Sequence, residues 1–205
     1  MRFKQVLALS AGRAGSKTFA NACSYITNYT SGHETRLAMP AAEKINYPDF
    51  HIESDNRLSW MLGLLNERLS DSVFYVYLYR DEEKIARSYN RRWAVKNGIM
   101  PAYAQGVLMM PTSRNDIVTC RDYVSCVHAN IKMFLKDKQY VVIDIDNPQE
   151  GFECFWEKIS AQGDKKKALQ AFEQADNTSS KMNLYRRLRY KAHLLLDKAE
   201  RTIRS

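Results

Sequence analysis

Residues 6–19 read VLALSAGRAGSKTF, a short apolar run that breaks into small and basic residues and continues as an amphipathic segment. This order is typical of a strand, a phosphate-holding loop and a helix. Glycines let the backbone approach a ligand closely, and the N-terminus of a helix carries partial positive charge. Arg13, Lys17 and the hydroxyls of Ser16 and Thr18 add charge and hydrogen-bond donors. The stretch therefore predicts a site for a negatively charged group, with an ordinary tight turn before a helix as the plainer alternative.

Farther along the chain, apolar and amphipathic segments alternate. Residues 73–79 and 140–146 have the composition of buried strands, residues 50–53 that of a short strand, and residues 29–47 look irregular. Helical spacing covers residues 16–28, 58–69, 82–93, 117–136, 149–160, 165–175 and 181–203. This alternation predicts an α/β fold in three layers, with a mostly parallel central sheet, helices on both faces and a helical C-terminus. Ligands of such sheets bind at the carboxyl ends of the strands.

The composition predicts one domain over residues 1–205, because 205 residues, 45% of them hydrophobic, can bury a sizeable core. A net charge of +8 favours acidic partners such as nucleotides and sulfated or phosphorylated compounds. No base-reading motif is present, so nucleic acid is not the expected partner. The predicted helix at 181–203 has one apolar stripe, which could pack on its own domain or pair with a second subunit to form a homo-oligomer.

The N-terminal apolar run, Val6 to Leu9, is far too short for a signal peptide or a membrane span. The cysteines show neither a CxxC pair nor a metal-like grouping with histidine, so reduced thiols are expected. These are Cys23, Cys120, Cys126 and Cys154. The expected location is the cytoplasm, with no transmembrane segment.

Two nucleotide-binding motifs compete for residues 12–18. The loop of nucleoside triphosphatases and kinases is written GxxxxGK[ST]. Lys17 and Thr18 match its end, but Gly15 stands only two residues before the lysine and Gly12 only three before Gly15. A nucleotide-dependent kinase with a phosphate-binding loop therefore stays one alternative, and a non-catalytic module that binds a nucleotide or polyanion stays another.

The second motif is more specific, because GRAGS at residues 12–16 resembles the phosphosulfate loop of the sulfotransferase family, usually written G-[RK]-[ST]-G-[ST]-[ST]. Residues 77–81, YLYRD, and the Ser88-Tyr89 pair resemble the family's second signature, with Glu82 in place of its proline. In that family, an arginine at a strand end and a serine eight positions later hold the 3′-phosphate of the donor. The resemblance covers the order of elements from about 6 to 159 and implies a sulfotransferase fold like that of phosphate-loop proteins, of the bacterial or carbohydrate-directed type.

The resemblance implies a donor co-substrate, 3′-phosphoadenosine 5′-phosphosulfate (PAPS), and no metal. The sulfuryl group would move in line to a hydroxyl acceptor, a small molecule or a glycan. Arg13 would stabilise the charge that grows on the leaving phosphate. Lys17 replaces the hydroxyl residue usual in the family, and it could add a second cation or point to solvent. The donor-binding residues implied are Gly12, Arg13, Ala14, Gly15, Ser16, Lys17, Thr18, Arg80 and Ser88.

An acceptor hydroxyl loses its proton as it attacks, so the site needs a general base. His33-Glu34, in the GHE run at 32–34, resembles a run that many bacterial and carbohydrate-directed members place after the first helix. In those relatives the glutamate is the usual base. Glu34 is therefore the favoured base, His33 is the alternative, and two ordinary polar loop residues are the plainer interpretation.

Other segments give weaker signals. Asp55 and Arg57 follow a predicted strand and could contact substrate, whereas His128 lies among apolar residues and is expected to be packed. Residues 162–167 have a faint likeness to the family's third nucleotide-binding segment. Residues 94–116, with two prolines and two glycines, predict a loop long enough to act as a lid.

Overall fold

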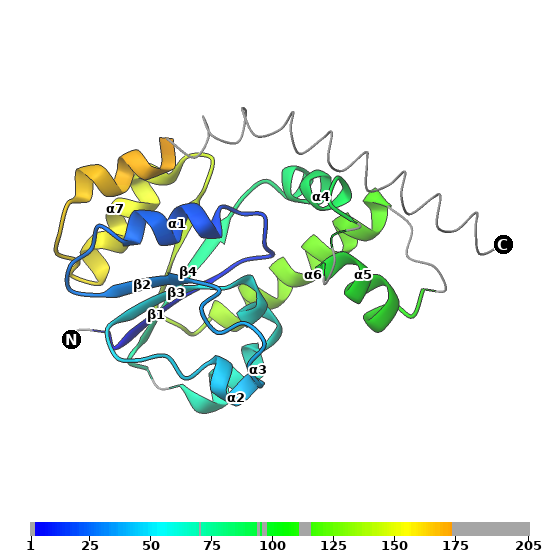
Figure 1. Cartoon of the computed structure of the whole chain (residues 1–205), viewed down its shortest axis with the longest axis horizontal. Helices are drawn as coiled ribbons and strands as arrows, with labels where there is room; N and C mark the ends of the chain where they lie inside the picture. The colour runs from blue at the N-terminus through cyan, green and yellow to red at the C-terminus, as the bar shows by residue number, and fades with distance from the viewer. Residues whose placement is uncertain (1–2, 70, 94, 96–97, 111–115, 174–205) are drawn as a thin grey trace.

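The computed structural model describes residues 3–69, 71–93, 95, 98–110 and 116–173 (Figure 1). Within these residues, five strands form one sheet in the order β2-β3-β1-β4-β5. All four strand pairings are parallel. The strands are β1 (Gln5–Leu9), β2 (Thr30–His33), β3 (His51–Ser54), β4 (Val73–Tyr79) and β5 (Tyr140–Asp144). The predicted α/β fold with a largely parallel sheet is confirmed.

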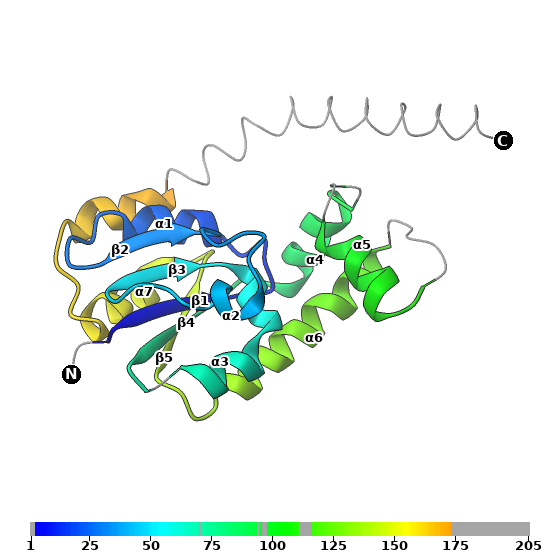
Figure 2. The same ribbon diagram turned by 60° about the horizontal axis from the view of Figure 1, so that its bottom comes forward.

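Helices cover both faces of the sheet (Figures 1 and 2). The helical elements are α1 (Ser16–Cys23), α2 (Ala41–Lys44), η1 (Asn56–Trp60, a 3₁₀-helix), α3 (Leu62–Arg68), α4 (Glu82–Asn90), α5 (Ile99–Ala102), η2 (Tyr103–Val107, a π-helical turn), α6 (Ile117–Leu135) and α7 (Pro148–Lys158), and residues 165–173 are helical as well. In β4, Phe74 packs on Phe155 of α7, while Tyr75 meets Phe134 of α6 edge-on. Successive strand residues point to opposite faces, so α7 and α6 lie on opposite sides of the sheet.

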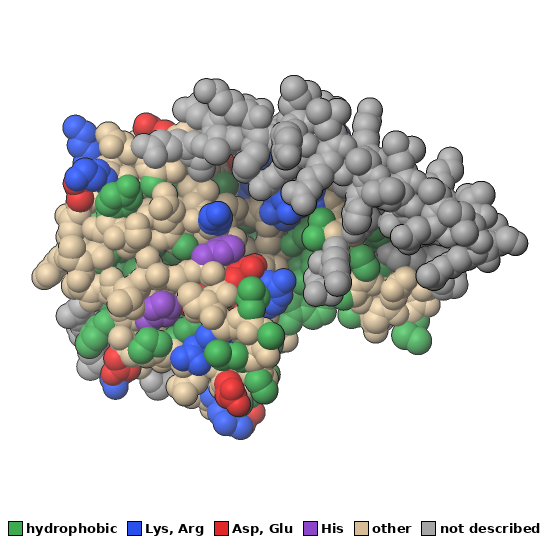
Figure 3. All heavy atoms as spheres, viewed as in Figure 1, with side chains coloured by type: hydrophobic (Ala, Val, Ile, Leu, Met, Phe, Trp, Pro, Cys, Tyr) green, Lys and Arg blue, Asp and Glu red, His purple; other side chains and the backbone are tan. Residues whose placement is uncertain are grey.

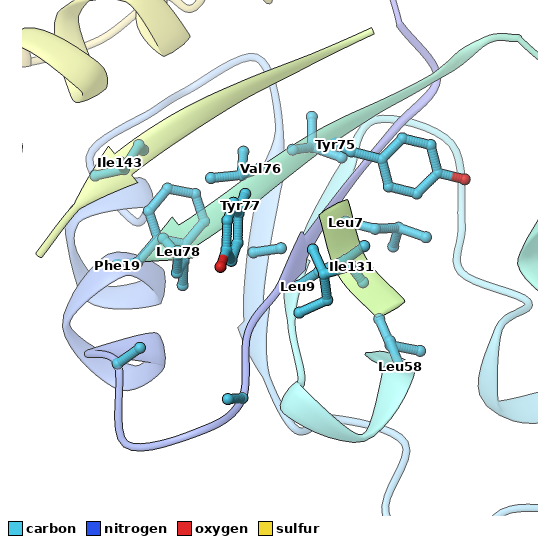
Figure 4. Packing of buried hydrophobic residues seen from close by; sticks show 14 of the residues in the cluster. Leu7, Leu9, Phe19, Leu58, Tyr75, Val76, Tyr77, Leu78, Ile131 and Ile143 are labelled. Carbon is cyan, nitrogen blue, oxygen red and sulfur yellow. The ribbon is translucent and has the colours of Figure 1, made fainter. Parts of the chain in front are cut away.

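The core is centred on β1, whose residues 6–9 are almost completely buried. Figure 4 shows Leu7 and Leu9 on the side of the sheet where Ile131 of α6 lies, and Phe19 of α1 over Leu78 of β4. The composition of residues 73–79 favours β4 as the central strand, but β4 lies beside β1, which takes the middle position. An edge position leaves much of β5 exposed, although its composition predicts a buried strand.

The segment predicted to be irregular, residues 29–47, contains an edge strand, β2, and the short helix α2. The preceding helix, α1, ends at Cys23 rather than at residue 28. Beyond it, Ile26 forms an antiparallel bridge with Gly163, and the Thr27 amide donates to the Gln162 carbonyl at 2.7 Å. Contacts with a distant segment therefore end α1 where its periodicity alone would continue it.

Part of the predicted lid at 94–116 is helical, because α5 and η2 occupy residues 99–107. The predicted helix at 181–203 lies outside the described residues. In the part of the chain that the structure describes, no helix combines the length and apolar character needed to cross a membrane.

Candidate functional site

The loop between β1 and α1 has an unusual backbone. Gly12, Arg13 and Gly15 have φ angles of 79°, 59° and 71°, in the left-handed region. A β-carbon on Gly15 would lie 2.6 Å from Cγ1 of Ile145, and one on Gly12 would lie 2.1 Å from the hydroxyl of Tyr89. Both positions therefore require glycine. Proteins build anion-binding nests where a right-handed residue is followed by a left-handed one, because successive backbone N–H groups then point to one concave side. Gly15, left-handed after Ala14 of negative φ, suits such a nest.

Neighbouring elements hold the start of this loop in place. The hydroxyls of Tyr89 in α4 and Tyr123 in α6 both donate to the Ala11 carbonyl, at 2.7 and 3.0 Å. Burial raises the pKa of Tyr89 well above its ordinary value and that of Tyr123 to about 12, so both stay protonated donors. From η1, the Ser59 hydroxyl donates to the Ser10 carbonyl at 3.0 Å and accepts from the Ser10 amide at 3.2 Å. The loop is thus fixed from three directions.

The structure brings Arg13, Arg80 and Ser88 together. Nε of Arg13 donates to the Ser88 hydroxyl at 3.1 Å, and Nη1 of Arg80 donates to the Arg13 carbonyl at 3.3 Å. Arg80 follows the last residue of β4, and Ser88 lies two turns into α4, so strand and helix direct both side chains at the loop. Two residues near this group were not predicted: Asp146 lies 3.3 Å from Nε of Arg80 and 2.9 Å from Nζ of Lys84.

His33 and Glu34 lie at the end of β2 and point to different partners. Nε2 of His33 lies 3.0 Å from the hydroxyl of Ser16, at the start of α1. Oε1 of Glu34 lies 2.9 Å from Nη1 of Arg57 in η1. His33 is therefore on the side of the loop, and Glu34 is on the side of η1.

Lys17 and Thr18 begin α1 directly after the loop. The side chain of Lys17 is exposed and that of Thr18 is half-buried. Figure 3 shows basic, acidic and histidine side chains side by side near the start of α1 and the ends of β2 and β3. The loop therefore opens onto a mixed, strongly charged surface.

Asp55 lies in the core, so it cannot contact substrate as the sequence suggested. Its side chain is 0% exposed, and Oδ2 lies 2.7 Å from Nζ of Lys44, which is itself only 4% exposed. Its other oxygen accepts from the Arg57 amide at 2.8 Å and caps η1. Asp55 thus fixes the position of the turn that carries Arg57.

A second buried pair stands beside the first. Nε2 of His51 lies 3.0 Å from Oε2 of Glu53, and the Thr35 amide donates to Oε1 of Glu53 at 3.1 Å. Burial alone would raise the pKa of Glu53, but hydrogen bonds from His51 and Thr35 outweigh it and hold that pKa below its ordinary range. The hydroxyl of Thr30 contacts Nδ1 of His51 at 2.8 Å, so β2, β3 and the following turn share one buried polar network.

His128 is packed, as its apolar neighbours predict. Its ring meets those of Tyr77 and Tyr79, and Nδ1 lies 3.0 Å from Oε1 of Glu82. Burial lowers the pKa of His128. Residues 162–163 contact the chain just after the C-terminal end of α1, about 12 Å of helix away from the loop. The segment 162–167 therefore stands apart from the group formed by Arg13, Arg80 and Ser88.

Comparisons with known proteins relate the chain to one fold. No family model matches the sequence, and no curated protein matches it either. Among solved structures, a "Sulfotransferase Domain from the Curacin Biosynthetic Pathway" matches with a TM-score of 0.59 and 13% sequence identity, covering 83% of this chain and 78% of that chain. Identity at this level speaks for the fold alone. The chain has the fold of a sulfotransferase domain.

Proposed function

We propose that this protein is a sulfotransferase that takes a sulfuryl group from PAPS and transfers it to a hydroxyl acceptor. One observation carries the proposal: the left-handed loop and the group formed by Arg80 and Ser88 are in direct contact through Arg13. Two anion-binding features so close together suit a donor that is phosphorylated at two separate places. ATP offers no phosphate at its 3′ position, so a kinase would have no use for the second feature.

The residues present fit such a donor. The Gly12 N–H donates to the Ser10 hydroxyl at 3.1 Å, so it belongs to the loop's own framework. The backbone N–H groups of residues 14–16, at the start of α1, and the hydroxyl of Ser16 suit the 5′-phosphosulfate. Arg80 and Ser88 suit the 3′-phosphate, because a guanidinium and a hydroxyl can each donate to a different phosphate oxygen. Lys17 is exposed beside the loop and can supply a further cation.

When bound, the donor supplies the sulfuryl group, whose bond to the phosphate oxygen breaks as its bond to the acceptor oxygen forms. Arg13 and the loop N–H groups stabilise the negative charge left on the phosphate. Glu34 takes the proton of the acceptor hydroxyl, because its carboxylate lies toward η1 and not toward the loop that would hold the donor. Arg57, whose Nη1 lies 2.9 Å from Oε1 of Glu34, orients the Glu34 carboxylate. His33 contacts Ser16 and therefore serves the donor side.

The acceptor that we propose is a ring compound, and a carbohydrate is the candidate that we favour. Trp60 is 44% exposed, lies nearly parallel to Tyr123 with ring centroids 6.1 Å apart, and meets Tyr103 edge-on. Side chains three residues apart share a face of a 3₁₀-helix, so Trp60 lies on the same face of η1 as Arg57. A flat apolar surface beside the proposed base suits the apolar face of a sugar ring.

A binding and transfer experiment on the full chain tests the proposal. Adenosine 3′,5′-bisphosphate without magnesium should raise the unfolding temperature, because a ligand that binds only the native state stabilises it. Labelled PAPS should then transfer sulfate to members of a panel of glycans and small alcohols. Stabilisation by ATP with magnesium alone would instead indicate a kinase, and bisphosphate binding without transfer to any acceptor would indicate a binding module.

A further inference from the structure

We propose that Lys84 is a third ligand of the 3′-phosphate, and that Asp146 is a carboxylate that occupies the phosphate position until the donor replaces it. The inference rests on the proposed function, because it concerns the same nucleotide. Oδ1 of Asp146 lies 3.3 Å from Nε of Arg80, and Oδ2 lies 2.9 Å from Nζ of Lys84. One carboxylate thus engages two cations beside the loop.

The three candidate ligands form a row. Lys84 and Ser88 are four residues apart in α4 and therefore lie on one face of that helix. Arg80, between β4 and α4, joins them because Asp146 contacts both Arg80 and Lys84. Asp81 caps α4 by accepting from the Lys84 amide at 2.9 Å, which fixes where the helix and the row begin. Because β5 pairs with β4, Asp146 just beyond β5 faces this row.

The contacts of Asp146 match those that a phosphate would make. A carboxylate offers two acceptor oxygens, and here each faces a different cation. A phosphate offers three acceptor oxygens and a charge of about −1.5 to −2 at neutral pH. It can therefore engage Arg80 and Lys84 in the same way and still reach the Ser88 hydroxyl.

Charge requires Asp146 to leave when a phosphate enters. Arg80 and Lys84 together carry two positive charges, which complement a phosphate dianion, whereas a carboxylate that stayed between them would repel it. The hydrogen bond from Lys84 to Asp146 raises the pKa of Lys84, so the two charges are coupled. The side chains of Asp146 and Lys84 are 26% and 56% exposed, which leaves room for the carboxylate to turn toward solvent.

Glu83 provides a built-in contrast on the same helix. Its carboxylate also engages two cations, Arg87 and Arg121, both at 2.7 Å. Arg121 belongs to α6, so this cluster ties α4 and α6 together. Substituting Glu83 changes the net charge by the same amount as substituting Asp146, without touching the row.

The test is a titration of the full chain with adenosine 3′,5′-bisphosphate and, separately, with adenosine 5′-monophosphate, both without magnesium. Asp146→Asn should tighten binding of the bisphosphate by about fivefold, the size expected for one partly exposed charge pair, and Lys84→Gln should weaken it by about the same factor. Binding of the monophosphate should stay constant in both variants. Glu83→Gln and Arg87→Gln are the matched controls and should leave both affinities unchanged.

The outcomes separate this inference from the proposed function. If the unaltered protein binds both nucleotides equally, the proposed donor site fails and the inference fails with it. If it prefers the bisphosphate but Asp146→Asn leaves that affinity unchanged or lowers it, the donor site stands and the role of Asp146 is overturned. Asp146→Ser is the second variant, should Asp146→Asn unfold, because it also removes the carboxylate.

Discussion

Two charged clusters of the molecule differ chiefly in their exposure to water. The inner cluster consists of Lys44, His51, Glu53 and Asp55. The outer cluster consists of Arg80, Lys84 and Asp146. In the inner cluster the side chains are at most 10% exposed, whereas those of the outer cluster are between 26% and 56% exposed.

This difference teaches what each cluster can do. A buried ion that loses its partner stays desolvated, so the inner cluster holds one arrangement and thereby fixes η1 and the end of β2. A partly exposed ion that loses its partner is solvated by water at little cost. The exposure of the outer cluster thus suits the exchange that we propose, of the Asp146 carboxylate for a phosphate, while the buried inner cluster keeps one arrangement.

The largest effect that we expect is on the reaction rate, from substitution of Glu34, the proposed base; the carboxylates of the inner cluster should affect stability instead. Glu34→Gln should lower kcat by about 10²-fold to 10⁴-fold, because a general base contributes about that much. Bisphosphate affinity and stability should stay unchanged, since Glu34 lies on the η1 side of the loop. Steady-state rates with labelled PAPS check this. The control is Glu43→Gln in α2, and an unchanged rate for Glu34→Gln would move the base elsewhere.

The second largest effect should be a loss of stability when a charge is removed from the inner cluster. Asp55→Ala leaves Lys44 buried without its carboxylate, so the free energy of unfolding should fall by about 3–5 kcal/mol. Urea denaturation measures it. Asp49→Ala, which breaks the exposed pair with Lys4 at the opposite end of the strands, should cost less than about 1 kcal/mol. Similar losses in both variants would remove the distinction between buried and exposed pairs.

The matching change in the outer cluster should affect binding rather than folding. Arg80→Ala should weaken bisphosphate binding by at least about tenfold, since a hydrogen bond to a charged group is worth about 1.5 kcal/mol or more. Affinity for the monophosphate should change far less. The free energy of unfolding should move by less than about 1 kcal/mol. A large loss of stability would instead show that Arg80 is needed for folding.

The smallest effect that we expect is a loss of stability at low pH. Because hydrogen bonds lower the pKa of Glu53 in the folded protein, this carboxylate stabilises the fold above its ordinary pKa of about 4.3. That contribution is lost as the pH falls further, through the lowered pKa. Urea midpoints measured between about pH 3 and 6 should show this loss, and Glu53→Gln should flatten it. An equal slope in the variant would assign the acid sensitivity to other groups.

Sequence patterns predicted the parts of the fold whose residues repeat regularly. The predictions for residues 73–79 and 117–136 match β4 and α6 closely, because a buried strand and a helix with one buried face show their period in the sequence. The edge strand β2, TSGH, has no apolar alternation, so nothing local distinguishes it from a loop. The end of α1 depends on residues 162–163, which lie far away in the sequence.

The candidate site divides in the same way. Arg13 and Arg80 could be placed together from the sequence, because each follows the carboxyl end of a strand and such ends meet at one edge. The resemblance to the sulfotransferase signature adds Ser88 to them. The roles of Asp55 and Asp146 could not be predicted. Both are aspartates that follow a strand, and only the packing around them decides that one is sealed in the core and the other stays at the surface.

The anchoring of the loop by Tyr89 has one more consequence, because Tyr89 is the neighbour of Ser88 in α4. Tyr89 holds the loop backbone that would bind the 5′ group, and Ser88, the residue before it, would bind the 3′-phosphate. In the proposed complex, adjacent residues of one helical turn would therefore set the distance between the two phosphate positions. Such a site would select a ligand by the distance between its two phosphates as well as by their charge.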